Sequence, residues 1–214
     1  MKMRPGDIYF EDYGSFEIVR GCGVHHFPSH IHRSDCLISL TSGQADMVIG
    51  EQETRLSAGK SVLIPRLAAH SLWPVDGTPY GYITLCFNSG ADFEGASGSH
   101  GFQGRALKFI ADCQDSFDLA ALCDHCHVSK FHLIRQFKRW FGLTPHQYYD
   151  NLRIRKIRQG LLSGSPLPDL AYALGFFDQS HMCRTFKKYM AVTPRQYKRS
   201  YFLHTRAGEK TASI

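Results

Sequence analysis

Residues Leu122 to Tyr197 contain one pattern written twice, and this repeat decides the expected fold of the C-terminal half. The first copy contains Arg135-Gln-Phe-Lys-Arg139 followed by Thr144-Pro-His-Gln-Tyr148. The second copy contains Arg184-Thr-Phe-Lys-Lys188 followed by Thr193-Pro-Arg-Gln-Tyr197, at an offset of 49 residues. An internal repeat of this kind indicates two copies of one supersecondary unit.

Each copy predicts an amphipathic helix with one apolar face and one basic face. Apolar residues recur at helical spacing: Leu133, Phe137, Trp140 and Phe141 in the first copy, and Met182, Phe186, Tyr189 and Met190 in the second. A short apolar segment and a tight turn precede each of these helices. Gly175 lies in the second turn and His127 in the first, where a positive φ would be less comfortable. Short helix, turn and basic helix predict two helix-turn-helix units.

The Thr-Pro-x-Gln sequence after each basic helix predicts the start of another helix. Threonine is a good N-cap, proline suits the first helical position, and glutamine three residues after the cap completes a capping box. We therefore expect helices to begin at Thr144 and Thr193, the first reaching about Leu162. That helix would be about 27 Å long, which suits two recognition helices held about one DNA turn, roughly 34 Å, apart.

The stretch from about Gly104 to Arg199 resembles the DNA-binding domain of the AraC/XylS family of transcription regulators. The likeness is densest where Gly175-Phe-x-Asp-Gln-Ser-His181 precedes Arg184-x-Phe-Lys-Lys188. The resemblance implies a sequence-specific regulator, favours an activator, and names double-stranded DNA and RNA polymerase as partners. By position it implies base and phosphate contacts from Lys130, Phe131, Ile134, Arg135, Gln179, Ser180, His181, Arg184, Lys187 and Lys188. The alternative is a helical bundle with a solvated basic face.

The charge of the chain is divided unevenly between its halves. Residues 1–103 contain 7 Lys and Arg against 11 Asp and Glu, whereas residues 104–214 contain 18 against 8. The C-terminal half therefore has a net charge of +10 and the N-terminal half −4. This asymmetry indicates that the C-terminal half binds a polyanion.

Residues Asp7 to Phe87 read as short β-strands separated by glycines and turns. Strands are expected at residues 16–20, 36–40, 46–49, 61–65 and 80–87, a spacing typical of a small antiparallel barrel or sandwich. The fold class is therefore α+β with more than one domain. We expect a sensor barrel at 1–88, a flexible linker at 89–101, a DNA-binding domain at 102–202 and a frayed tail at 203–214.

Two spaced patterns in the strand region resemble the signature motifs of the cupin superfamily. The first is His30-x-His32, Cys36 and Gly43; the second is Gly59, Pro65 and His70. The resemblance implies a cupin barrel with the metal ligands His30, His32, Cys36 and His70. Cys36 stands where metal-binding cupins have glutamate. Three imidazoles and a thiolate suit zinc or another divalent metal.

A metal-free barrel is the alternative for the N-terminal domain. Many regulatory cupins bind an organic effector or nothing, and the residues then expected to line an effector pocket are Trp73, Tyr82 and Phe87. Full-length members of the regulator family usually carry a helical dimerisation segment between the two domains. The glycine- and serine-rich residues 88–101 leave little room for it, so a homodimer stays an open possibility.

The sequence Cys123-Asp-His-Cys126-His127 matches the C-x-x-C-H pattern of covalent haem attachment. It overlies Leu170-Ala-Tyr-Ala-Leu-Gly175 of the second copy, so both cysteines fall at packing positions. Haem attachment normally accompanies export, and the N-terminal residues lack the apolar core of a signal peptide. We therefore expect buried reduced thiols, with a thiol or metal switch as the alternative.

Two other function classes compete with the regulator. A cupin oxygenase or isomerase would rest on His30, His32 and His70 alone and would leave the basic repeat without a purpose. A nonspecific nucleic-acid binder would need the charge but not the matched turns and caps. We expect a cytoplasmic regulator that is not an enzyme. We also expect no membrane partner, since no apolar run approaches the roughly 20 residues of a membrane span.

Overall fold

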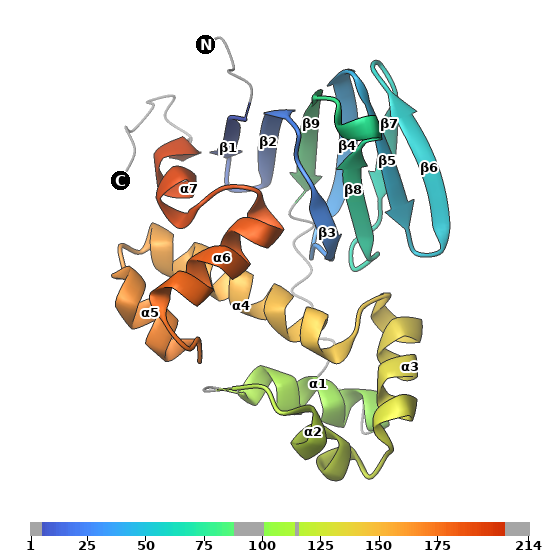
Figure 1. The fold of residues 1–214 in the computed structure, drawn as a ribbon, viewed down its shortest axis with the longest axis vertical. Helices are drawn as coiled ribbons and strands as arrows, with labels where there is room; N and C mark the ends of the chain where they lie inside the picture. The colour runs from blue at the N-terminus through green and yellow to red at the C-terminus, as the bar shows by residue number, and fades with distance from the viewer. Residues whose placement is uncertain (1–5, 88–100, 114–115, 204–214) are drawn as a thin grey trace. The chain divides into compact units, whose positions relative to one another are not determined.

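The computed structural model describes residues 6–87, 101–113 and 116–203 (Figure 1). Except for Gly101 and Leu203, the expected linker and tail lie outside these residues. The chain divides into two compact units: residues 1–90 with 186–214, and residues 91–185. The expected α+β class is confirmed, because the first unit is built on strands and the second on helices.

The N-terminal strands form two sheets of a cupin-like barrel. They are β1 (Ile8–Asp12), β2 (Phe16–Gly23), β3 (Phe27–His30), β4 (Asp35–Ser42), β5 (Gln44–Ile49), β6 (Gln52–Ser57), β7 (Ser61–Ile64), β8 (His70–Pro74) and β9 (Tyr80–Phe87), with a 3₁₀ turn η1 (Val75–Gly77) before β9. One sheet has the order β10-β1-β2-β9-β4-β7, in which β10 is the strand Tyr201–Leu203, and the other has the order β3-β8-β5-β6. The second sheet contains three strands that the sequence did not single out, β3, β6 and β8.

The barrel core lies between the two sheets. Leu40 and Met47, from facing sheets, are both almost fully buried, as is Tyr80. Along β9 every second side chain from Tyr80 to Cys86 points into this core, as the two-residue period of a strand requires. The Tyr82 ring lies over Gly21 on the neighbouring strand, where a Cβ atom would come within 2.3 Å of it. Only glycine fits at this position.

The helical part contains both expected helix-turn-helix units. The helices are α1 (Phe102–Asp112), α2 (Leu119–Cys126), α3 (Lys130–Phe141), α4 (Pro145–Leu162), α5 (Leu167–Ala173), α6 (Gln179–Met190) and α7 (Pro194–Ser200). The first unit is α2 with α3, and the second is α5 with α6. In the apolar stripes of α3 and α6, Leu133, Phe137, Met182 and Phe186 are fully buried.

The expected caps are confirmed at both repeats. Thr144 and Thr193 each form a capping box with the glutamine three residues later. The helix α4 ends at Leu162, where the sequence placed its end. Asp118 caps α2 by accepting a hydrogen bond from the backbone of Ala120.

Each unit turns through left-handed residues at equivalent positions. His127 (φ 56°) ends α2, and Gly175 (φ 64°) occupies the same place after α5. Gly142 (φ 64°) ends α3, and Ala191 (φ 58°) follows α6 at the equivalent position. Each copy therefore has one glycine and one residue with a Cβ at these turns, and the residue with a Cβ is strained.

The end of the chain adds a strand that the sequence did not predict. Residues Tyr201–Leu203 form β10, which pairs in parallel with β1. The Tyr201 hydroxyl donates a hydrogen bond to Asp12, and the ring of Phe10 meets Tyr197 edge-on at 4.7 Å. Residues 201–203 were expected to lie at the boundary of a helical domain and a frayed tail, but an edge strand offers them backbone partners.

Candidate nucleic-acid interface and candidate metal centre

The first candidate recognition helix, α3, exposes most of the side chains expected to meet DNA. Lys130, Phe131 and Arg135 are exposed, whereas Ile134 is half-buried. Phe131 leaves 75% of its surface in solvent, whereas Phe137 and Phe141 on the same helix are buried. The Arg135 guanidinium lies 5.7 Å from the centre of the Phe131 ring. A cation and an apolar ring are thus presented together on the open face of α3.

The second candidate recognition helix, α6, also exposes most of the side chains expected to meet DNA. Gln179, Ser180, Arg184, Lys187 and Lys188 are exposed, and His181 is half-buried, with its ring edge-on to Phe176 at 5.3 Å. Asp178 caps the helix by accepting a hydrogen bond from the His181 backbone at 2.6 Å. This cap was not predicted from the sequence, although an aspartate before an amphipathic helix is a known start signal.

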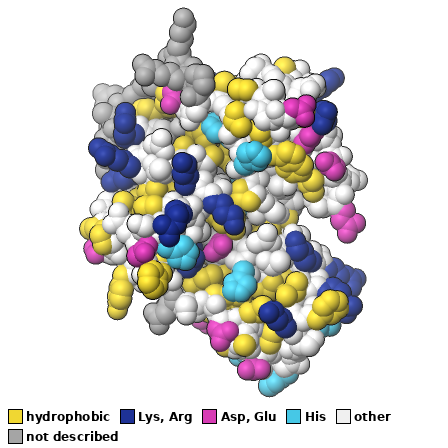
Figure 2. All heavy atoms as spheres, in the orientation of Figure 1, with side chains coloured by type: hydrophobic (Ala, Val, Ile, Leu, Met, Phe, Trp, Pro, Cys, Tyr) yellow, Lys and Arg dark blue, Asp and Glu magenta, His cyan; other side chains and the backbone are white. Residues whose placement is uncertain are grey.

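Basic side chains gather on the helical surface. In Figure 2, Lys and Arg side chains are grouped over α6 and α7. Both α6 and α7 also carry two basic residues in the last turn. This arrangement is the electrostatic footprint expected of a DNA-binding face.

Arg153 on α4 supports the second helix-turn-helix unit, a role that was not predicted from the sequence. The side chain is buried, and its guanidinium lies 3.6 Å from the centre of the Phe176 ring. It donates hydrogen bonds to the carbonyl oxygens of Leu174 and Gly175 and forms an ion pair with Asp150 at 3.1 Å. Arg153 therefore fixes the turn between α5 and α6 to the long helix.

The C-x-x-C-H sequence belongs to the packing of the first unit. Cys123 and Cys126 are buried in α2, and His127 is its left-handed C-cap. Burial raises the pKa of both thiols, which keeps them protonated. A protonated, buried cysteine acts as a small hydrophobic residue.

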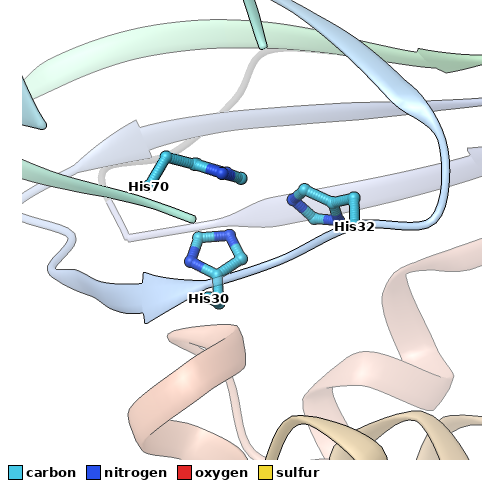
Figure 3. A group of neighbouring side chains, drawn as sticks. All are labelled: His30, His32 and His70. Atoms are coloured by element: carbon cyan, nitrogen blue, oxygen red, sulfur yellow. The ribbon is translucent and has the colours of Figure 1, made fainter. Parts of the chain in front are cut away.

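Three imidazoles meet in the barrel. His30 and His70 are cross-strand partners on β3 and β8, and His32 follows β3 in the chain. One nitrogen from each ring lies within 4.8 Å of the others. Figure 3 shows the three rings turned toward one another.

Hydrogen bonds fix the tautomer and the orientation of two of these rings. The Nδ1 atom of His30 lies 2.8 Å from the Pro28 carbonyl oxygen, and that of His70 lies 3.0 Å from the Ala68 carbonyl oxygen. A carbonyl can only accept, so Nδ1 carries the proton and Nε2 keeps its lone pair. Such contacts orient metal-binding histidines. The Nε2 atom of His70 is buried and has no hydrogen-bond partner.

Burial also keeps the imidazoles of His30 and His70 neutral. Burial and the neighbouring His30 ring lower the pKa of His70 to about 3, and burial lowers the pKa of His30. Protons therefore compete little with a metal near neutral pH. Because the orphaned Nε2 atom and the fixed tautomers provide nitrogen ligands, the three histidines fit a zinc ion or another divalent transition metal.

Cys36 is not part of this group, which corrects the four-ligand set expected from the sequence. The chain leaves β3 after His30, and Cys36 lies in β4 of the other sheet, paired with Cys86 of β9. Its Sγ atom lies 3.0 Å from that of Cys86. The expected shared face failed because residues 31–34 do not continue the strand.

The expected effector pocket also needs correction. Tyr82 is buried in the core, but Trp73 and Phe87 are on the opposite faces of their strands from His70 and Cys86. Alternation of side chains along a strand accounts for this. Within the barrel, Tyr82 instead approaches Phe27 and His25, with ring centroids 5.8 and 6.0 Å away. The Tyr82 hydroxyl and His25 Nδ1 are buried without a hydrogen-bond partner.

Comparison with known families decides the classification. The model of the AraC-like ligand binding domain matches residues 13–130, and a helix-turn-helix domain model matches residues 122–200. The chain belongs to the AraC family of regulators. The expected family and its cupin-like N-terminal domain are thereby confirmed.

Curated relatives of this AraC-family chain match its helix-turn-helix region over short stretches. The HTH-type transcriptional regulator YbfI of Bacillus subtilis is 40% identical over 52 residues, covering 24% of this chain and 19% of YbfI. The regulatory protein Ada of Salmonella typhimurium is 39% identical over 62 residues, covering 29% of this chain and 18% of Ada. The chain thus matches about a fifth of the length of these relatives.

A solved structure shares the fold over most of the AraC-family chain. Apo ToxT of Vibrio cholerae, in a variant form, aligns with a TM-score of 0.53 and 14% identity over 87% of this chain and 97% of ToxT. The fatty-acid-bound wild-type ToxT aligns with a TM-score of 0.52 and 12% identity over 86% and 95%. Among the described residues, no helix has the length and apolar character to cross a membrane.

Proposed function

We propose that this chain is a sequence-specific DNA-binding transcription regulator, an activator, whose barrel senses a metal ion or small molecule. The observation that carries the proposal is the pair of capped helix-turn-helix units with exposed basic faces on α3 and α6. The family models for a helix-turn-helix domain and a ligand-binding domain support both halves of it. Double-stranded DNA and RNA polymerase are the proposed partners, and a homodimer remains compatible with it.

In this proposal α3 and α6 enter successive major grooves. Arg135 and Arg184 are each suited to a bidentate contact with guanine, and Phe131 and Ile134 to contact with thymine methyl groups. Lys187 and Lys188 on the exposed side of α6 serve phosphate contacts, which position the helix without reading sequence. Arg153 positions the second unit by holding the turn before α6.

A random-sequence DNA selection with the full chain tests the specific-binding proposal. A specific regulator should enrich one bipartite motif and bind it at least about 10³-fold more tightly than scrambled DNA at physiological salt. A nonspecific binder would enrich no motif, and its affinities for the two DNAs would fall together as salt rises. That second outcome would refute the proposal.

We propose a divalent metal as one input to the barrel, with His30, His32 and His70 as its ligands. The fixed Nδ1 protons and the orphaned Nε2 of His70 support this assignment. A zinc ion held at about 2.0–2.1 Å would supply a fixed positive centre in the barrel. The three ligand nitrogens lie within 4.8 Å of one another, and an ion that draws them together would favour one barrel conformation.

An organic effector is the second candidate input. The buried hydroxyl of Tyr82 and the bare Nδ1 of His25 favour it, because buried polar atoms without partners cost about 1–3 kcal/mol each. A small polar ligand beside Phe27 would satisfy both. Thermal shift assays with divalent metals and with small metabolites, on natural and His70→Asn chains, separate the two inputs.

A further inference from the structure

Two buried cysteines lie opposite each other on neighbouring strands of the six-stranded sheet. Cys36 on β4 and Cys86 on β9 are register partners. They are 0% and 6% exposed, and their Sγ atoms lie 3.0 Å apart. We propose that Cys36 and Cys86 are a thiol–disulfide pair: oxidation joins β4 to β9 by a reversible bond inside the barrel.

The backbone already satisfies the geometry of a disulfide. Residues directly opposite in antiparallel strands have Cα atoms about 4.5–5.5 Å apart, within the range of about 4.4–6.8 Å that disulfides span. The two sulfur atoms need to approach by only about 1 Å to reach the bond length of about 2.05 Å. Side-chain rotation supplies a movement of this size, so the strands keep their register.

The pair stands apart from the cysteines that the sequence pattern highlights. Cys123 and Cys126 have the C-x-x-C spacing of redox motifs, but they lie on consecutive turns of one helix, α2. A bond between them would constrain little beyond that helix. A bond between Cys36 and Cys86 instead closes a loop of 50 residues and joins two neighbouring strands of one sheet.

The oxidant is a peroxide or a small-molecule disulfide. With hydrogen peroxide, the thiolate of one cysteine attacks the O–O bond, forms a sulfenic acid and releases water. The second thiol then attacks the sulfenic sulfur and releases a second water. The sum is two thiols and one hydrogen peroxide giving one disulfide and two waters. A small dithiol reverses the step by exchange. Because both sulfur atoms are buried, the oxidation is slow. The protein must therefore be treated with the oxidant for hours rather than seconds.

This bond would give the barrel an input separate from its imidazoles. Cys36 lies four residues after His32 in the chain, and β4 lies between β7 and β9 in its sheet. Linking β4 to β9 removes their freedom to shift relative to each other. The inference does not depend on metal binding or DNA recognition, because its test reads the sulfur atoms directly.

Peptide mapping of the full chain tests the pair. Trypsin releases Cys36 in the peptide 34–55 and Cys86 in the peptide 67–105, each with no other cysteine. Folded protein is treated with hydrogen peroxide or oxidised glutathione, alkylated under denaturing conditions and digested. We expect the two peptides joined, two hydrogens lighter than their sum, and separated again by dithiothreitol.

Two variants control the measurement. Cys86→Ser should abolish the joined species and leave Cys36 open to alkylation, whereas Cys22→Ser on β2 should leave the joined species unchanged. The proposal is overturned if Cys36 and Cys86 are both fully alkylated after the oxidant has consumed other thiols. It is also overturned if Cys36 is joined mainly to a different cysteine. If Cys86→Ser does not fold, peptide mapping of the oxidised natural chain is sufficient to show whether Cys36 is joined to Cys86, joined to another cysteine or alkylated.

Discussion

His30 and His70 lie directly opposite each other on β3 and β8, with ring centroids 4.2 Å apart. Each ring donates its Nδ1 proton to a backbone carbonyl two residues earlier. The two strands thus hold matched imidazoles with Nε2 atoms available on both. An arrangement fixed by the backbone on both sides favours a function beyond core packing.

Zinc binding should depend on His70 and not on a nearby exposed histidine. We expect natural protein freed of metal by chelator to bind about one zinc ion per chain and to gain thermal stability on binding. His70→Asn should lower the zinc affinity at least about 10-fold, while His26→Asn, at an exposed position, should not. Isothermal titration calorimetry measures both. Equal zinc affinity in the two variants would remove the metal proposal and leave the organic effector.

The barrel should lose stability as the pH falls below about 6.5, because burial lowers the pKa of the His25 imidazole from its ordinary value. Below pH 6.5 the unfolded chain takes up a proton that the folded chain resists. The contribution of neutral His25 to the free energy of unfolding is therefore complete above pH 6.5. It is lost as the pH falls toward the lower pKa of His25 in the folded chain. Urea unfolding of metal-free protein at pH 7.5, 6 and 5 measures it.

The matched controls for this pH effect are neighbours in sequence. His25→Gln should weaken the pH dependence, whereas His26→Gln at the exposed position should leave it unchanged. An equal slope in both variants would mean that His25 does not titrate differently in the folded and unfolded chain.

Two turns should become more stable with glycine. His127 and Ala191 have φ angles of 56° and 58°, where a Cβ is strained. His127→Gly and Ala191→Gly should each raise the free energy of unfolding by about 0.5–1 kcal/mol. The reverse change, Gly142→Ala at φ 64°, should lower it. Guanidinium denaturation followed by helical circular dichroism checks all three, and a loss of stability in His127→Gly would contradict the strain argument.

Arg153 should stabilise the second unit through its shape as well as its charge. Arg153→Ala should destabilise the fold by about 2–3 kcal/mol, because it removes a stacked cation and charge-assisted hydrogen bonds to the turn. Arg153→Lys should recover little, since an ammonium cannot stack and fork in this way. Lys156→Ala, at an exposed position on the same helix, is the control. Full rescue by lysine would show that charge alone matters.

The sequence predicted best the features that depend on residues close together in the chain. The capping boxes at Thr144 and Thr193 were predictable because the cap, the proline and the glutamine lie within four consecutive positions. His30, His32 and His70 come together in the structure because two of them share one short stretch and β8 pairs with β3.

Features that depend on strand direction and pairing could not be predicted from spacing alone. Cys36 fell in the other sheet because the chain turns between His32 and Asp35. Trp73 was expected in the effector pocket although no strand was predicted around it, and β8 places its side chain on the face opposite to that of His70. Arg153 and β10 were missed because their partners, Phe176 and β1, are distant in sequence.

The affinity of Arg135→Ala and Arg184→Ala for the selected DNA motif tests the central claim most directly. Each variant should bind that motif about 1–3 kcal/mol more weakly and lose preference for its guanine, at a different half of the motif for each arginine. Lys187→Ala is the matched control and should weaken specific and scrambled DNA alike, with a flatter salt dependence. Unchanged affinity and unchanged base preference in both arginine variants would contradict the assignment of α3 and α6 as the helices that read DNA.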